Sequence, residues 1–255
     1  MFWIDAILYV MIYSFAGWVC ECVYCSVLDA KLTNRGFLNG PFCPMYGVAA
    51  VVMVWALNFL PQYISVVFVG SVIIASLIEY VTSWGMEVLF KAKWWDYSKK
   101  RFNINGRVCL LNSTLFGILG VVLMFDLHPA ISGVVTYFGY EFKMGFLIAF
   151  LMYFTFDLSV TLYSVLGLNI QLKRIAELKE KIETKYSTIS EILSAKESEE
   201  KSRLEMAYEN LSHKSDILKR RILDAFPDVQ SLKYNKTLDD LKNHLKKGRN
   251  KNDEQ

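Results

Sequence analysis

Residues Ile64–Phe90 read ISVVFVGSVIIASLIEYVTSWGMEVLF, an apolar run of 27 residues whose only charged side chains are Glu79 and Glu87. At about 1.5 Å of rise per helical residue, this run exceeds the roughly 30 Å of hydrocarbon in a bilayer. Backbone amide and carbonyl groups find no partner in lipid, so such a run has to be a helix rather than an open strand. The sequence is that of a membrane protein.

Four more apolar runs lie outward from this one, roughly at Phe2–Leu28, Tyr46–Leu60, Val108–Leu127 and Met144–Leu168. The run from Tyr46 is short for a crossing. Pro129 and Gly133 argue against a sixth span after the fourth. Residues 1–168 are therefore predicted to form an all-α, polytopic membrane helix bundle of about five spans.

The rest of the chain has a different character. Residues 1–168 carry 9 acidic and 9 basic side chains, about 11% of that part, whereas residues 169–255 carry 16 and 19, about 40%. Isoleucine and leucine at 3-, 4- and 7-residue spacing predict a charged helical hairpin or coiled coil over 169–226. It would bind a partner, self-associate or form a solvated appendage. Residues 227–255 are expected to be a short helix and a disordered C-terminus.

Basic residues gather in alternate loops. Six lie between the third and fourth runs, two between the first and second, and Lys173 and Arg174 follow the fifth, whereas Lys143 alone lies on the other side. Lys and Arg accumulate on the cytoplasmic side of membrane proteins. We therefore predict a multi-pass protein of the cell membrane with its N-terminus outside and its tail cytoplasmic.

Several functional classes have little support. The net charge is only +3, which does not favour nucleic-acid binding. No phosphate-binding loop or nucleophile-elbow pattern occurs, so ATP hydrolysis by this chain is not expected. Cys20 and Cys22 would lie about 200° apart on a helix, and the three histidines lie outside the span centres. We expect no metal site and no cofactor.

Three carboxylates, those of Glu21, Glu79 and Glu87, lie inside the predicted spans. A charge in a span costs about 2.5 to 3.5 kcal/mol on insertion scales, so each is a candidate functional residue. Arg35 and Arg107 are the expected compensating charges, because the topology places them at the same membrane depth. Two interpretations stay open: a polar binding site, or ion pairs that lock the helices together.

The segment Asn34–Gly47 reads NRGFLNGPFCPMYG, which is too apolar for an ordinary loop and too rich in Gly and Pro for a continuous helix. Irregular backbone at membrane depth is tolerated where it is buried in protein or lines a cavity. We expect a re-entrant or interfacial segment that includes Asn34 and Arg35. The alternative is a tight loop whose prolines begin the second span.

A second dense patch runs from Lys93 to Arg107 and includes Asp96, Tyr97 and Asn103. Aromatic and basic residues favour the headgroup zone and attract anionic lipid, so an interfacial anchor explains much of the patch. Asp96 and the side-chain amides suggest a second role. They would hydrogen-bond a polar headgroup, or cap the fourth helix.

Several motifs in this order resemble the CmpB-type ABC-transporter permease family of bacteria, over about residues 10–125. They are Phe15-Ala16-Gly17-Trp18 with Glu21, Asn34-Arg35-Gly36-Phe37-Leu38 through Gly47, Glu79-Tyr80 with Glu87, Trp94-Trp95-Asp96-Tyr97-Ser98, and Asn103 to Gly106-Arg107. The resemblance implies a permease that works with a separate ATPase subunit. It also implies that the residues singled out on physical grounds are family signature positions, whereas the charged tail is not part of the family pattern.

We therefore expect a transporter, permease-type or lipid-handling protein with a polar cavity open to the cytoplasmic leaflet and in contact with membrane lipids. The predicted substrate-binding residues are Glu21, Asn34, Arg35, Glu79, Glu87, Asp96, Tyr97, Asn103 and Arg107. One alternative is an intramembrane lipid-modifying enzyme with Glu79 or Glu21 as general base, which the missing nucleophile disfavours. Another is a membrane-anchored scaffold that acts through its helical tail.

Overall fold

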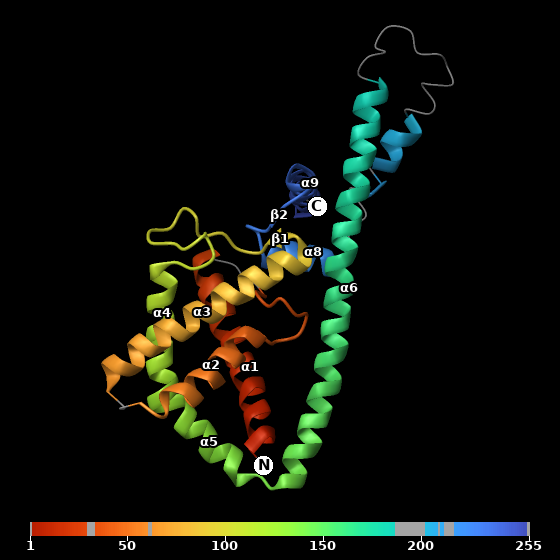
Figure 1. The fold of residues 1–255 in the computed structure, drawn as a ribbon. Helices are drawn as coiled ribbons and strands as arrows, with labels where there is room; N and C mark the ends of the chain where they lie inside the picture. The colour runs from red at the N-terminus through yellow and green to blue at the C-terminus, as the bar shows by residue number, and fades with distance from the viewer. Residues whose placement is uncertain are drawn as a thin grey trace.

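The computed structural model describes residues 2–29, 34–60, 63–186, 202–208, 210–211 and 217–253. Nearly all of them are helical (Figure 1). The elements are α1 (Phe2–Asp29), α2 (Pro44–Leu57), α3 (Ile64–Phe90), β1 (Ala92–Lys93), α4 (Leu110–Val122), the π-helical turn η1 (Leu123–Leu127), α5 (His128–Tyr137), α6 (Tyr140–Tyr186), α8 (Ile217–Ala225), β2 (Gln230–Ser231) and α9 (Asn235–Asp253).

Four helices of the described chain are long and apolar enough to cross a membrane: Trp3–Val27, Ile64–Phe90, Leu110–Tyr137 and Tyr140–Thr184. The predicted membrane helix bundle is thereby confirmed. The expected second span is shorter than the others, because α2 has only 14 residues. At 1.5 Å per residue it is about 21 Å long, less than the hydrocarbon thickness.

The fourth span differs from its prediction at its far end. It was expected to stop at Leu127, but η1 carries it into α5 and on to Tyr137. Pro129 lies in the first turn of α5, where a missing backbone N–H is tolerated. In the π-helical turn before Pro129, the backbone hydrogen bonds shift from the α-helical to the π-helical pattern. Proline therefore lies inside one continuous span instead of ending it.

Close helix packing builds the bundle. A Cβ added to Gly120 of α4 would lie 2.1 Å from the Ser71 hydroxyl of α3, and one added to Gly117 would lie 2.6 Å from the Phe68 ring. Small residues let helices approach closely in a membrane, where there is no hydrophobic driving force between them. α3 and α4 therefore pack backbone against backbone.

We call the end of the bundle where α1 and α3 finish and α4 begins the polar end. The tail returns to this end, at the top in Figure 1. β2 pairs with β1 in antiparallel register, Ala92 opposite Ser231. Phe90, Trp94, Ile222 and Phe226 are buried in one cluster. The tail and the membrane helices thus share a hydrophobic core.

α6 crosses residue 168 without a break and continues to Tyr186, so the membrane span and the start of the charged tail are one helix. The residues that would turn a hairpin, 187–201, lie outside the described residues. The predicted hairpin or coiled coil of 169–226 therefore stays a prediction. The last helix, α9, is longer than the short helix that the sequence suggested.

Candidate functional site

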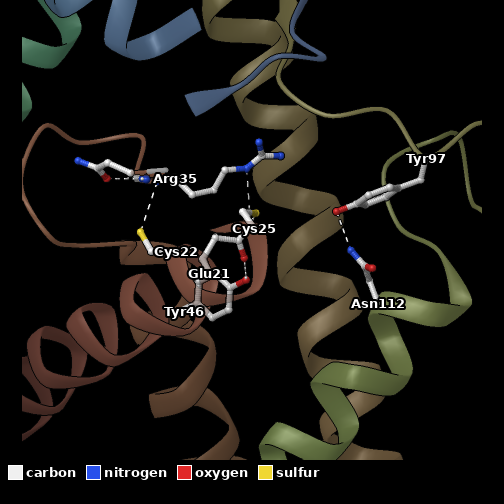
Figure 2. A network of polar contacts seen from close by, with 9 residues as sticks. Glu21, Cys22, Cys25, Arg35, Tyr46, Tyr97 and Asn112 are labelled. Atoms are coloured by element: carbon white, nitrogen blue, oxygen red, sulfur yellow. Dashed lines mark hydrogen bonds and ion pairs between the residues drawn. The ribbon is translucent and has the colours of Figure 1, made fainter. Parts of the chain in front are cut away.

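Glu21, near the end of α1, lies in a small group of polar side chains (Figure 2). Tyr46 Oη donates a hydrogen bond to Glu21 Oε2 at 2.5 Å, and Arg35 Nε lies 3.9 Å from Glu21 Oε1. The guanidinium of Arg35 also stacks over the Phe226 ring of the tail, 5.6 Å from its centroid. Arg35 therefore links a membrane carboxylate to the tail.

The first turn of α2 reaches Glu21 because Gly17 has no side chain. A Cβ at Gly17 would lie 2.3 Å from Tyr46 Cβ. Asn34, which was predicted to belong to the site, forms hydrogen bonds with neighbouring residues instead. Its Oδ1 accepts from Trp18 Nε1 at 2.8 Å and from the Gly36 amide at 3.2 Å. Asn34 therefore shapes the loop rather than facing a cavity.

The irregular segment 34–43 is held from two sides by charged groups. Arg221 of α8 donates to the Gly36 carbonyl at 3.0 Å and to the Phe37 carbonyl at 2.9 Å. On the other side, Asp157 of α6 accepts from the backbone amides of Asn39 at 3.0 Å and Gly40 at 2.8 Å. Backbone groups of this irregular segment thus find partners within the protein. No sequence signal pointed to Arg221, because it lies in the charged tail.

Glu87 and Arg107 form a salt bridge at the polar end. Arg107 Nη2 lies 2.8 Å from Glu87 Oε2, and the guanidinium lies over the Tyr80 ring, 5.5 Å from its centroid. Their side chains are 19% and 15% exposed. The expected pairing of Glu87 with an arginine is confirmed. It ties the loop before α4 to the last turns of α3.

Glu79, in the middle of α3, has a different environment. Its side chain is buried, with 4% exposed, and no arginine pairs with it among the described residues. The Tyr97 hydroxyl donates to the Glu79 carboxylate. Asn112 Nδ2 donates to the Tyr97 oxygen at 2.7 Å, as Figure 2 shows. Glu79 Oε2 has no hydrogen-bond partner in the described chain. Of the two arginines expected to compensate the carboxylates, Arg35 pairs with Glu21 and Arg107 pairs with Glu87, and neither pairs with Glu79.

Tyr97 is suited to donate this bond. Burial raises the pKa of the Tyr97 phenol well above its usual range, and the nearby Glu79 and Glu21 carboxylates raise it further. The phenol therefore stays protonated. It offers one hydrogen bond to Glu79 but no positive charge.

A cavity of about 190 Å³ opens beside Glu79. Its walls come from α1, α2, α3, α4 and η1, and include Tyr13, Tyr46, Ala75, Glu79, Phe116 and Gly120. Most of the lining is apolar, and Glu79 is the only charged side chain among the described residues that line it. This differs from the expected polar cavity: Arg35 and Arg107 are not in its wall, and Glu87 and Arg107 form their own pair.

Asp96 and Asn103 hold their own loop together. Asp96 Oδ1 accepts from the amide and the hydroxyl of Ser98, which lower the pKa of Asp96. Asn103 Nδ2 donates to the carbonyls of Ser98 and Lys100 at 3.2 and 2.9 Å, and Asn103 Oδ1 accepts from the Gly106 amide at 3.1 Å. Neither residue lines the cavity. Tyr97, between them, is the member of this patch that reaches Glu79.

A second polar contact involves another residue of the cavity wall, and it was not predicted from the sequence. Tyr13 Oη and His128 Nδ1 are 2.6 Å apart, and Tyr13 lines the cavity. His128 was expected to lie outside the span centres, just after a fourth span that ended at Leu127, whereas η1 and α5 continue that span beyond it.

A protein-family model described as "Putative ABC-transporter type IV", of the CmpB type, matches residues 8–162. No curated protein and no solved structure matches the chain. The matched region runs from α1 into the first half of α6, so it includes the cavity, Glu79 and both ion pairs. The tail residues Arg221 and Phe226 lie beyond it.

Proposed function

The chain belongs to the family of putative type IV ABC transporters of the CmpB type, and we propose that it is the membrane-embedded permease component of a transporter whose substrate binds in the Glu79 cavity. We also propose that a separate ATPase subunit supplies the energy. The family and the four long apolar helices support a transporter of the membrane. The unpartnered oxygen of Glu79, beside an apolar cavity, is the observation that supports the site.

The substrate class follows from the chemistry of the cavity. A volume of about 190 Å³ with mainly apolar walls suits a small hydrophobic body, since apolar cavities of about 150 Å³ stay dry and take up benzene-sized molecules. A buried carboxylate oxygen without a partner favours a ligand that donates to it or carries a positive charge. We infer an amphipathic substrate with an apolar body and an ammonium or another hydrogen-bond donor.

Tyr97 and Asn112 would act as positioning residues in this site. Asn112 of α4 donates to the Tyr97 oxygen, and Tyr97 donates to Glu79 of α3. These two hydrogen bonds leave Glu79 Oε2 available to the ligand. A buried carboxylate with no counter-charge is unfavourable. A cationic ligand would supply that counter-charge.

Binding of benzylammonium to the purified full chain tests the site, with toluene as the uncharged probe of the same shape. We expect Glu79→Gln to weaken benzylammonium binding by about tenfold to 100-fold, the usual range for one hydrogen bond to a charged group. Binding of toluene should not change. The matched control is Glu141→Gln, because Glu141 is exposed at the start of α6. Equal benzylammonium affinity in the wild type and Glu79→Gln would contradict the proposal.

We further propose that the polar end and the tail face the cytoplasm and the N-terminus faces outward. The supporting observation is the distribution of Lys and Arg among the loops. In a cysteine-free chain, Lys99→Cys should resist impermeant thiol reagents added outside intact cells, whereas Tyr140→Cys at the opposite end should react. The reverse labelling pattern would overturn this orientation.

A further inference from the structure

The loop between β1 and α4 exposes basic and apolar side chains together. Lys99, Lys100 and Arg101 are exposed, and no salt bridge to them occurs within the described chain. The next residue, Phe102, is 77% exposed, and Ile104 is 59% exposed. Large apolar side chains exposed together on one loop are unfavourable in water. They indicate that this loop contacts something other than water.

The loop is rigid in spite of its exposure. Asn103 makes three hydrogen bonds across it, and the Tyr97 amide donates to the Gly106 carbonyl at 2.8 Å. Phe102 has a φ of 52° and Asn105 a φ of 53°, in the left-handed region. That conformation is unfavourable for a phenylalanine and persists only where the surroundings hold it. The loop thus holds Phe102 outward at a conformational cost.

The position of the loop points to the membrane surface. Ile104 pairs with Val108 in an isolated β-bridge, which brings the loop next to the start of α4. Leu110 and Leu111, in the first turn of α4, are 53% and 54% exposed and begin the candidate span Leu110–Tyr137. In Figure 1 the loop lies at the upper end of α4, away from α9 and the tail. Its exposed apolar residues therefore adjoin the exposed apolar start of a candidate span, and its three exposed cations lie next to them in the sequence.

We propose that the loop 97–107 is a binding site for anionic phospholipid. Lys99, Lys100 and Arg101 contact the phosphate groups, while Phe102 and Ile104 insert beside the upper parts of the acyl chains. Three positive charges complement an anionic leaflet, and an exposed aromatic ring is favourable in the interfacial zone. The residues that contact the lipid in this proposal are distinct from those that line the Glu79 cavity.

The test is the number and affinity of phospholipids retained by the purified full chain, measured by native mass spectrometry. The probes are phosphatidylglycerol and phosphatidylcholine with identical acyl chains. We expect the triple variant Lys99→Gln, Lys100→Gln and Arg101→Gln to bind phosphatidylglycerol up to about 100-fold more weakly, given the usual contribution of each cation at an anionic surface. Phosphatidylcholine binding should change little.

The control removes the same charge elsewhere: Arg174→Gln, Lys181→Gln and Lys236→Gln, three exposed cations of α6 and α9. It should retain wild-type phosphatidylglycerol binding. Phe102→Ser should weaken the binding of both lipids without changing the charge preference. Unchanged thermal midpoints show that all variants are folded. If the loop variant binds phosphatidylglycerol as the wild type does, or loses no more than the control, the proposal is overturned.

Discussion

Two regions of α3 each carry a glutamate, but only one of the two carboxylates is paired with an arginine of the described chain. Glu87, near the end of α3, forms a 2.8 Å salt bridge with Arg107. Glu79, eight residues earlier and about 80° around the helix, has a phenol as its partner and leaves Oε2 unpaired beside a cavity. A charge within a span therefore does not by itself indicate a binding site. The difference lies in whether another part of the chain has already neutralised it.

The two environments have different energetic consequences. In the Glu87 region the counter-charge comes from the loop before α4, so the pair fastens two segments together. In the Glu79 region Tyr97 donates one hydrogen bond and no charge, so the carboxylate can accept more. The first region is expected to govern stability and the second to govern binding. The following predictions test that division, from the largest expected effect to the smallest.

Glu87→Ala should reduce the free energy of unfolding by about 3 kcal/mol, because it leaves the guanidinium of Arg107 buried without its counter-charge. Glu79→Ala should cost less, since it breaks one hydrogen bond from Tyr97 and, within the described chain, no salt bridge. Denaturant titration of the purified protein measures both. The double variant Glu87→Gln with Arg107→Gln should recover part of the loss. Equal losses for Glu79→Ala and Glu87→Ala would refute the division between the two regions.

Tyr97→Phe should reduce stability by about 2 kcal/mol, because the Glu79 carboxylate loses a donor and the Asn112 amide loses an acceptor. It should also weaken benzylammonium binding less than Glu79→Gln does, since the charge of Glu79 remains. Tyr140→Phe, at an exposed tyrosine of α6, is the control and should change neither quantity. A Tyr97→Phe variant with wild-type stability would show that the phenol is not holding Glu79.

Arg221→Gln should reduce stability by about 1 kcal/mol through the loss of charge-assisted hydrogen bonds to the Gly36 and Phe37 carbonyls. Hydrogen exchange in segment 34–43 should speed up, because the tail no longer holds the segment. Arg174→Gln, at an exposed arginine of α6, should leave exchange there unchanged. Unaltered exchange in the Arg221 variant would mean that the tail does not hold this segment.

Asp96→Asn should have the smallest effect, because Asp96 is partly exposed and acts only within its loop. Hydrogen bonds from Ser98 lower the pKa of Asp96 in the folded state. Its contribution to stability is therefore present above the pKa of the unfolded chain, about 3.9, and is lost as the pH falls through the lower folded value. Hydrogen exchange at the Ser98 amide should rise with that loss. A pH-independent exchange at this amide, once its intrinsic rate is allowed for, would argue against the carboxylate as the anchor.

Much of the membrane fold could be predicted from local sequence. Long apolar runs must satisfy their backbone groups within one helix, so length and composition identify α1, α3 and α6 directly. The fourth span was predicted to end at Leu127, and Pro129 beyond it was used only as an argument against a sixth span. The structure shows that the π-helical turn η1 leads directly into α5, so the helix continues past Pro129.

The candidate site, like the fold, could be predicted only in part from the sequence. Glu21, Glu79 and Glu87 stand out in the sequence because charges are rare and costly inside spans. Which arginine meets which glutamate depends on how helices pack, since Arg35 reaches Glu21 and leaves Glu79 to Tyr97. Tertiary packing also decides two further roles. Asp96 and Asn103 hold their own loop together, and Arg221 holds segment 34–43.

From its sequence alone, this chain is determined to be a helical membrane protein with carboxylates buried in its spans, because hydrocarbon length and the cost of charge act on each segment separately. The tertiary structure decides which carboxylate stays available. Partners and cavities arise between segments distant in the chain, and a hydrogen bond or a void depends on distances of a few ångströms that no local pattern records.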